Sequence, residues 1–153
     1  MKKLALPTLL AVTVVAAFAF FKPSPKPAIL NHIAYYVHDL KTSTAFYQDI
    51  IKLDTIPEPF HDGKHTWFSV GTVSHLHLIQ GAAKGLPHDK NTHLCFSVPS
   101  VEEVMKRLEK AGITWENWAG NSKTPTVRVD GVRQIYFQDP DGYWVEINDD
   151  KMQ

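Results

Sequence analysis

Residues 31–37 read Asn-His-Ile-Ala-Tyr-Tyr-Val, and residues 92–98 read Thr-His-Leu-Cys-Phe-Ser-Val. The two stretches align on His32 and His93, which lie 93 − 32 = 61 positions apart. In both, the order is polar, His, aliphatic, small, aromatic, any residue, Val, and a helix-like run follows. A repeated unit of this length predicts a fold made by duplication. We therefore expect the two histidines to occupy equivalent places, facing each other across a pseudo-twofold axis.

The composition is that of one ordinary globular domain. The chain has 153 residues, of which 44% are apolar and 21% charged, and its 16 Lys and Arg balance 16 Asp and Glu. Because it has no basic stripe, we expect no nucleic-acid partner. The single cysteine, Cys95, excludes an internal disulfide. Its apolar strand predicts a buried small hydrophobe rather than a nucleophile.

The first 27 residues form a separate region. Two lysines precede an uncharged run from Leu4 to Phe21, and Ala17-Phe18-Ala19 fits a cleavage site. Residues 1–21 are therefore predicted to be a secretory signal peptide, with an uncleaved membrane anchor as the alternative. Residues 22–27, Lys-Pro-Ser-Pro-Lys-Pro, predict an extended tether. We expect the domain, residues 28–153, to be periplasmic or secreted, touching a membrane only through an uncleaved N-terminal segment.

The first predicted module spans residues 28–80. A strand over 29–37 is followed by a helix that starts after Asp39, a typical N-cap residue. An edge strand is expected over 54–60, because Pro57 and Pro59 cannot donate hydrogen bonds to a neighbour. Asp62-Gly63 predicts a hairpin turn. Two more strands, 66–70 and 74–80, complete a βαβββ unit.

The second predicted module spans residues 91–150 and repeats this order after a linker over 81–90. A strand over 92–98 precedes a helix that opens with the capping box Ser100 to Glu103 and stops near Gly112. The remaining predicted strands are 114–118, 126–129, 133–138 and 143–148. The expected fold class is α+β, with two βαβββ modules forming a curved mixed β-sheet around a metal site.

The first and last strands of each module carry one potential metal ligand. These are His32 and His77 in module one, and His93 and Glu146 in module two. If the two modules curl and face each other, the four side chains can point into one cavity. Three imidazoles and a carboxylate suit Zn, Ni, Co, Mn or Fe(II). Any two of the histidines with Glu146 would form a facial triad that leaves positions open for substrate.

Other histidines offer alternatives to this set. A single histidine in a strand is more often a structural residue than a ligand, so the register of the repeat carries the prediction. His75 lies on the same strand face as His77 and is an alternative ligand or a neighbour of the site. We favour His77, because it stands in the register of Glu146. We expect four histidines at turns or strand ends to be solvated: His38, His61, His65 and His88. Of these, His61 or His65 could contact the substrate.

A family resemblance covers the whole domain but not the N-terminal segment. It is carried by residues 32–40, 45–47, 76–79, 93–98 and 137–147, the last reading Phe-Gln-Asp-Pro-Asp-Gly-Tyr-Trp-Val-Glu-Ile. On these residues the chain resembles the vicinal oxygen chelate superfamily. That superfamily includes glyoxalase I, fosfomycin- and bleomycin-resistance proteins, methylmalonyl-CoA epimerase and extradiol dioxygenases. The Asp-Pro-Asp-Gly turn before a Glu-bearing strand is specific for the superfamily and weak for any one member.

The resemblance implies a βαβββ pair around a divalent metal, a small-molecule substrate and a homodimer. Family metal positions fall on His32, His77, His93 and Glu146. Glyoxalase I-like proteins usually carry a glutamate where His77 stands, and epimerase-like proteins often a glutamine. Glu146 is therefore the leading catalytic base for a redox-inert metal, and His77 is a second candidate for the same part.

Three functions follow from the resemblance. The first is a glyoxalase I-like lyase or isomerase that acts on a small vicinal-oxygen substrate through a metal-stabilised enolate. The second is an Fe(II) extradiol-type dioxygenase that uses His32, His93 and Glu146. The third is a non-enzymatic binder like the bleomycin-resistance proteins. Specificity is expected to lie in the loops 81–90 and 119–125, which the fold does not determine.

Overall fold

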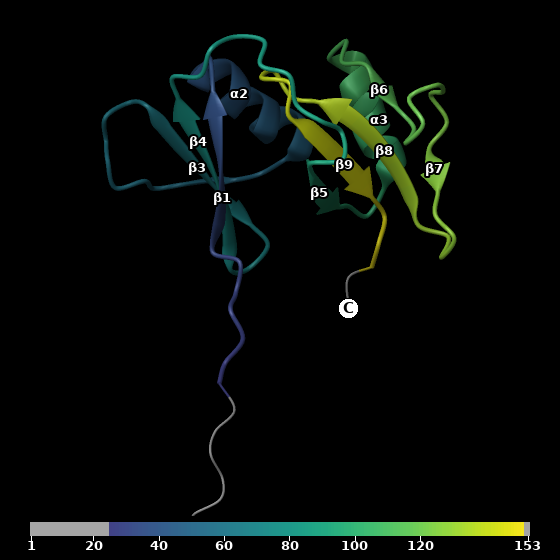
Figure 1. Ribbon diagram of the computed structural model, residues 1–153, viewed down its shortest axis with the longest axis horizontal. Helices are drawn as coiled ribbons and strands as arrows, with labels where there is room; N and C mark the ends of the chain where they lie inside the picture. The colour runs from purple at the N-terminus through teal and green to yellow at the C-terminus, as the bar shows by residue number, and fades with distance from the viewer. Residues whose placement is uncertain (1–24, 152–153) are drawn as a thin grey trace, which may run out of the picture.

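The computed structural model describes residues 25–151 (Figure 1). The predicted signal peptide, residues 1–21, lies outside the described residues, as do the first residues of the predicted tether. Residues 25–31 form neither helix nor strand and lead into the domain at the start of its first strand. Within residues 25–151, no helix has the length and apolar character needed to cross a membrane.

Module one forms a four-stranded mixed sheet in the order β1-β4-β3-β2. Strand β1 runs parallel to β4, and the other pairs are antiparallel. The Asp39 carboxylate accepts the Thr42 backbone N–H at 2.7 Å and so caps the first helix, as predicted. The predicted strand 54–60 keeps only two residues at the sheet edge, and a loop over 57–64 replaces the tight hairpin expected at Asp62-Gly63. The elements are β1 (His32–Val37), α2 (Leu40–Phe46), the π-helical η1 (Tyr47–Ile51), β2 (Thr55–Ile56), β3 (His65–Val70) and β4 (Ser74–Gln80).

Module two repeats the same order of elements and the same pairing. Its sheet has the order β5-β9-β8-β6, with β7 added beside β8. The Ser100 hydroxyl accepts the Glu103 backbone N–H at 3.3 Å, so the predicted N-cap is present. The duplication read from the two histidine strands is therefore confirmed. The elements are β5 (His93–Ser97), α3 (Val101–Lys110), β6 (Trp115–Glu116), β7 (Thr126–Val127), β8 (Arg133–Gln138) and β9 (Trp144–Asn148).

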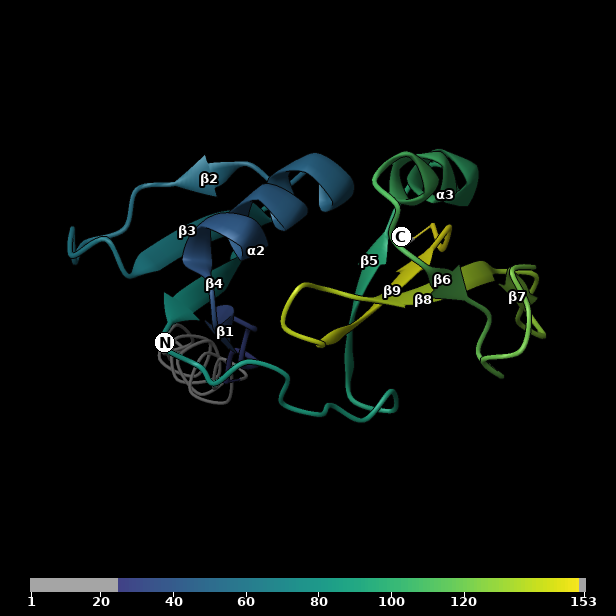
Figure 2. The same cartoon turned by 90° about the horizontal axis from the view of Figure 1, so that it is seen from above.

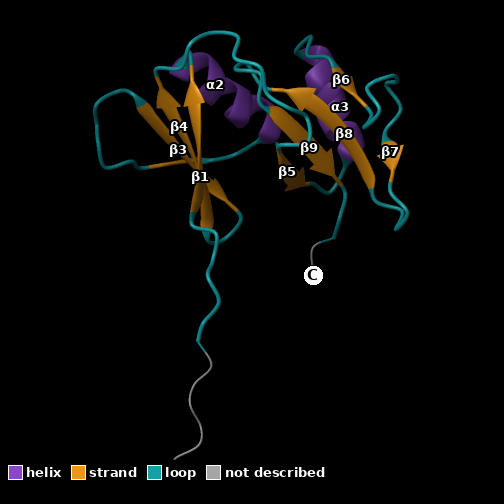
Figure 3. Cartoon of the chain, in the orientation of Figure 1, coloured by secondary structure: helices purple, strands orange, loops and turns teal. Residues whose placement is uncertain are grey.

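The modules form two separate mixed sheets, each with its helix on one face (Figures 2 and 3). Strand residues alternate between the two faces of a sheet. In β4, Leu76 and Leu78 are buried in the hydrophobic core with the helices, whereas His75 and His77 lie on the opposite face. In β9, Val145 and Ile147 are in the core, and Glu146 lies on the opposite face. We call these opposite faces the open faces of the two sheets.

The turn at residues 139–142 joins the two modules. One Asp141 carboxylate oxygen accepts the His38 backbone N–H at 2.5 Å, and the other accepts the Ser43 hydroxyl at 2.5 Å. Nearby, the Tyr47 hydroxyl donates to Asp139 Oδ2 at 2.8 Å. The turn of module two is thus docked onto the helix of module one, and the modules meet on their helical side rather than through their open faces.

Candidate metal centre

The strand register makes His77 and Glu146 equivalent positions of the two modules. His77 pairs with the residue two positions after His32, and Glu146 pairs with the residue two positions after His93. His75, by contrast, pairs with His32 itself. The register therefore relates His77, and not His75, to the glutamate of module two.

His32 and His77 form the first pair, on the open face of module one. Their rings stack with centroids 4.3 Å apart and an interplanar angle of 8°. The Trp67 ring stacks on His77 from the neighbouring strand β3, at 4.0 Å and 1°. His77, on the central strand β4, is thus held between two flat rings and has little freedom to rotate.

The nitrogens of this first pair suit a metal ligand. Asn31 Oδ1 accepts from His32 Nδ1 at 2.8 Å, which leaves the lone pair on Nε2. His77 is 8% exposed, and its buried Nε2 has no hydrogen-bond partner among the described residues. Burial lowers the pKa of His77, and the neighbouring His32 and His75 lower it further, so its ring is neutral at pH 7. A neutral imidazole with an unused nitrogen is the form that binds a transition metal.

His93 and Glu146 form the second pair, on the open face of module two. His93 Nδ1 donates to the Lys90 backbone oxygen at 2.8 Å, because a carbonyl can only accept. His93 Nε2 lies 3.1 Å from Glu146 Oε2. In a neutral ring this geometry points a lone pair at a carboxylate, which is unfavourable without a cation. A proton on Nε2 or a shared metal ion would satisfy both atoms.

Hydrogen bonds fix Glu146 in its charged form. It is 7% exposed. The Tyr136 hydroxyl donates to Oε2 at 2.6 Å, and Asn148 Nδ2 and Cys95 Sγ reach Oε1 at 3.0 and 3.2 Å. Burial raises the pKa of Glu146, but these three hydrogen bonds outweigh it and hold the pKa below its usual value. Glu146 is therefore an ionised carboxylate at neutral pH, as a metal ligand must be.

The expectation that Cys95 is a buried hydrophobe is wrong. Cys95 is exposed and lies on the open face, where it pairs with Glu146. The neighbours Leu94 and Phe96 point to the helical side, so strand alternation places Cys95 on the polar side. Partial burial of its sulfur and the Glu146 carboxylate raise the pKa of the Cys95 thiol to about 12. The thiol therefore stays protonated at neutral pH and is a poor nucleophile.

The two pairs do not meet within one chain, so the predicted single cavity with four ligands is not formed by a single copy. Across residues 25–151, no three His, Cys, Asp or Glu side chains gather closely enough to hold a metal ion. The physical reason is the joint between the modules. Each pair lies on its own open face, whereas the modules contact each other through their helical side and the turn at 139–142.

A hollow of about 490 Å³ lies beside the first pair. Phe60 forms part of its wall although the residue is 57% exposed. Glu58 holds this loop by accepting the backbone N–H of Phe60 at 2.6 Å and of His61 at 2.9 Å. The lining contains neither Lys, Arg, Asp nor Glu: Asn31, His32, Ala34, Phe60, His65, Trp67, His75, His77 and Ile79.

The histidines expected to be solvated divide into two groups. His38 and His61 are exposed, as predicted. His65 and His88 are half-buried, because His65 packs against Phe60 at 4.4 Å and His88 packs against Tyr143 at 3.8 Å between ring centroids. His65 therefore belongs to the wall of the hollow rather than to the solvated surface.

Comparison with known proteins identifies the family of this chain. Residues 29–147 match the model of the Glyoxalase/Bleomycin resistance protein/Dioxygenase superfamily. The chain is 27% identical to metallothiol transferase FosB of Staphylococcus epidermidis, over 78% of this chain and 80% of that protein. It is 25% identical to lactoylglutathione lyase of Pseudomonas putida, over 82% and 87%. The solved structure of oxidase ChaP-H2 matches with a TM-score of 0.67 and 25% identity, over 80% and 94%. The chain therefore belongs to the Glyoxalase/Bleomycin resistance protein/Dioxygenase superfamily.

Proposed function

We propose that this protein is a metal-dependent enzyme acting on a small substrate with two adjacent oxygen atoms. The observation that carries the proposal is the buried, unpartnered Nε2 of His77 beside His32. The close approach of His93 Nε2 to Glu146 Oε2, at 3.1 Å, also supports it, because a shared metal ion would satisfy both atoms. His32, His77, His93 and Glu146 would hold a divalent Zn, Ni, Co, Mn or Fe ion. Such an ion supplies the Lewis acidity that stabilises an enolate or another oxyanion of the substrate.

We further propose that two copies of the chain complete the centre. One chain offers two separate two-ligand pairs, whereas a catalytic metal usually has at least three protein ligands. In a twofold dimer, module one of each copy can face module two of the other, which uses every pair once and makes two equal centres. His32 and Cys95 are exposed on the two open faces, which supports these faces as the contact surfaces.

The leading reaction class is that of a lyase or isomerase that moves a proton. Glu146 is the one carboxylate among the four proposed ligands, which supports it as the base that accepts a proton from carbon next to a carbonyl. His77 is held between the rings of His32 and Trp67. That stack supports a ligand role for His77 rather than a swinging base, so the proton transfer is assigned to Glu146.

The lining of the hollow supports an uncharged substrate with an apolar body. Phe60, Trp67 and Ile79 offer apolar surface next to the first pair, and neither Lys nor Arg lines the hollow. An anionic group such as a phosphonate or carboxylate would find no fixed positive charge there. A planar dicarbonyl or diol would stack on the rings while its two oxygens reach the metal position.

The second candidate is an Fe(II)-dependent oxidation. His32, His93 and Glu146 are two histidines and a carboxylate, the ligand set of many non-haem iron oxygenases. The similarity to oxidase ChaP-H2 also favours this candidate. The non-enzymatic binder has weaker support, because the chain retains the complete set of side chains that a metal centre needs.

Metal content tests the proposal. Elemental analysis of natively expressed protein, followed by reconstitution with each of the five ions, should give about one ion per chain. A His32→Ala, His93→Ala variant should lose it, whereas His61→Ala, which changes an exposed histidine, should keep it. Protein that takes up none of the five ions would contradict the proposal. Oxygen uptake after anaerobic Fe(II) loading with a catechol would favour the oxidase over the lyase.

A further inference from the structure

Lys90 belongs to the segment that connects the modules, yet its side chain is packed against module two. Its Nζ donates to Glu116 Oε1 at 2.7 Å, to the Asn117 backbone oxygen at 2.7 Å and to the Trp118 backbone oxygen at 2.9 Å. An ammonium group has three N–H donors, so all three are used. Lys90 therefore fastens the connecting segment to β6 and the loop that follows it.

Three aromatic rings surround the same ammonium group. Its Nζ lies 4.8 Å from the centroid of Tyr136, 5.0 Å from that of Trp144 and 5.7 Å from that of Trp118. Each distance lies within the range of cation–π attraction. Because all three donors of the Lys90 ammonium group are used, none is free to bind an anionic substrate.

The backbone of Lys90 contacts the candidate metal centre. Its carbonyl accepts the Nδ1–H of His93 at 2.8 Å. The short turn between them is closed by Asp89, whose side chain accepts the Asn91 backbone N–H at 2.8 Å and whose carbonyl accepts that of Thr92 at 2.9 Å. The side chain of Lys90 thus fixes where this turn sits on the sheet, and the turn fixes the His93 ring.

Tyr136 connects the cage to the second member of the pair. Its ring faces Lys90 Nζ, and its hydroxyl donates to Glu146 Oε2 at 2.6 Å. Lys90 therefore contacts His93 itself through its carbonyl, and contacts Tyr136, the hydrogen-bond donor to Glu146, through its ammonium group.

We propose that Lys90 is a positioning residue that sets the direction of the His93 ring. Because the Lys90 carbonyl accepts from Nδ1, Nε2 of His93 faces Glu146, as a metal ligand requires. Loss of the side-chain anchor would release the turn from the sheet and break the Nδ1–H hydrogen bond. The link to metal binding rests on the function proposed above, whereas this hydrogen bond is a property of the metal-free chain.

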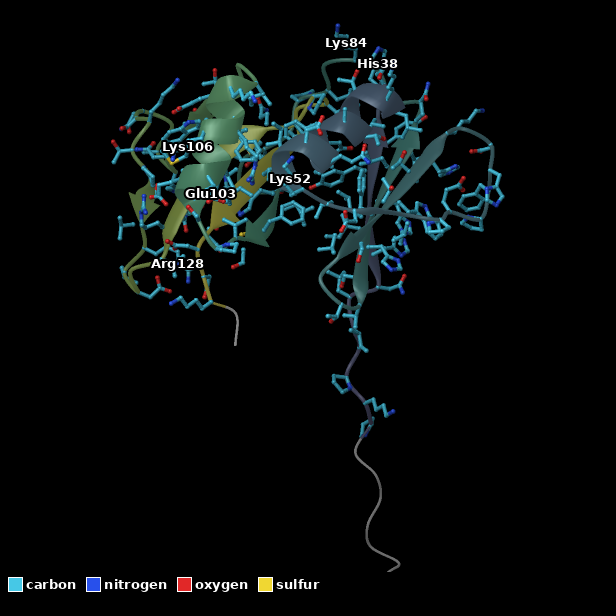
Figure 4. The ribbon with its side chains drawn as sticks, turned by 180° about the vertical axis from the view of Figure 1, so that it is seen from behind. His38, Lys52, Lys84, Glu103, Lys106 and Arg128 are labelled. Carbon is cyan, nitrogen blue, oxygen red and sulfur yellow. The ribbon has the colours of Figure 1, made fainter. Side chains whose placement is uncertain are left out.

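The test compares Lys90→Met with Lys84→Met, a matched change at an exposed lysine of the same segment (Figure 4). ¹H–¹⁵N NMR of the metal-free protein reports whether the His93 Nδ1–H is protected from exchange with water by its hydrogen bond to Lys90. It should be protected in the parent and in Lys84→Met, and should exchange rapidly in Lys90→Met. Zn(II) affinity should fall about 10- to 100-fold in Lys90→Met alone. If Lys90→Met does not fold, Trp118→Leu removes one ring of the cage and should also speed the exchange.

Two results would overturn the inference: an unprotected His93 Nδ1–H in the parent, or a folded Lys90→Met protein with the parent's protection and Zn(II) affinity. The readouts separate this inference from the proposed function. Loss of protection in Lys90→Met, when the parent binds no metal, would retain the positioning role and reject the metal centre. Metal binding in the parent with unchanged protection in Lys90→Met would reject the positioning role alone.

Discussion

The hydroxyl of Tyr47 donates a 2.8 Å hydrogen bond to Asp139 Oδ2, although the two residues are 92 positions apart. The other carboxylate oxygen of Asp139 accepts the backbone N–H groups of Asp141 and Tyr143, both at 2.9 Å. Asp139 is therefore a buried link between the helix of module one and the turn of module two. Burial raises its pKa to about 6, although hydrogen bonds from Tyr47 and two backbone amides oppose the rise.

This link predicts how stability changes with pH. The pKa of Asp139 is 3.8 as an ordinary carboxyl and about 6 in the fold. Because the folded value is higher, protonated Asp139 contributes fully to the free energy of unfolding below pH 3.8, and this contribution is lost as the pH rises through about 6. At neutral pH, ionised Asp139 lowers the free energy of unfolding by up to about 3 kcal/mol, at 1.36 kcal/mol per pKa unit.

The Asp139→Asn variant should therefore be more stable than the parent near pH 7.5, and the difference should shrink toward pH 4. Asparagine can still accept from the two amides and can donate to the Tyr47 oxygen. Chemical denaturation of both proteins across this pH range measures the difference. Parallel stability curves would show that Asp139 has the same pKa in the folded and unfolded states, which would contradict this prediction.

Asp141 gives a second prediction about the joint between the modules. It accepts the His38 backbone N–H and the Ser43 hydroxyl at 2.5 Å each. Its removal in Asp141→Ala leaves the buried Ser43 hydroxyl without this acceptor and should lower the free energy of unfolding by about 1–3 kcal/mol. Asp130→Ala, which changes an exposed aspartate of a hairpin turn, is the control and should have little effect. Equal thermal shifts for the two variants would contradict the docking role of Asp141.

The elements of the fold could be predicted from the sequence, because period-two alternation and helix caps are local signals. The predicted strands 74–80 and 133–138 are observed with the same limits. The predicted strand 54–60 was too long, since two prolines leave only Thr55–Ile56 paired. Sequence patterns carry no comparable signal for the way the two modules dock.

The equivalence of the two closing-strand positions was predictable from the sequence, whereas the separation of the two candidate pairs was not. The repeat register identified His77 and Glu146 as equivalent, and the strand pairing bears this equivalence out. The two pairs stay apart because Tyr47, Asp139 and Asp141 join the modules on their helical side. Tyr47 is distant in sequence from the two aspartates. Tyr136, the donor to Glu146, is absent from the residues that the sequence nominates for the site. Tyr136 lies opposite Glu146 in the β8–β9 register. This register position, rather than the residue type, identifies Tyr136 as a neighbour of the site.

The third prediction separates His77 from His75. His77→Gln removes a buried imidazole between His32 and Trp67 and should weaken Zn(II) binding at least about tenfold. His75→Gln changes a residue of the same strand face that pairs with His32 and should leave the affinity nearly unchanged. Isothermal titration of both variants with Zn(II) decides between them. A larger loss in His75→Gln would reassign the ligand.

The fourth prediction concerns the hollow beside the first pair. Phe60→Ala should keep the metal but weaken binding of catechol, an uncharged aromatic probe, about tenfold, because Phe60 is a preformed aromatic wall. Leu86→Ala, at an exposed apolar residue outside this hollow, should bind catechol as the parent does. Tighter binding of methylphosphonate than of catechol by the metal-loaded parent would refute an uncharged substrate.

We expect each metal centre to join module one of one copy to module two of another, and a mixed dimer of two variants tests this arrangement. One chain carries His32→Ala with His77→Ala, and the other carries His93→Ala with Glu146→Ala. Neither double variant alone should bind metal tightly. After co-expression with two different tags and purification on both, the mixed dimer contains one centre with all four ligands and one with none. We predict about one tightly bound Zn(II) per mixed dimer by elemental analysis. A mixed dimer that binds as little Zn(II) as the separate variants would contradict the account.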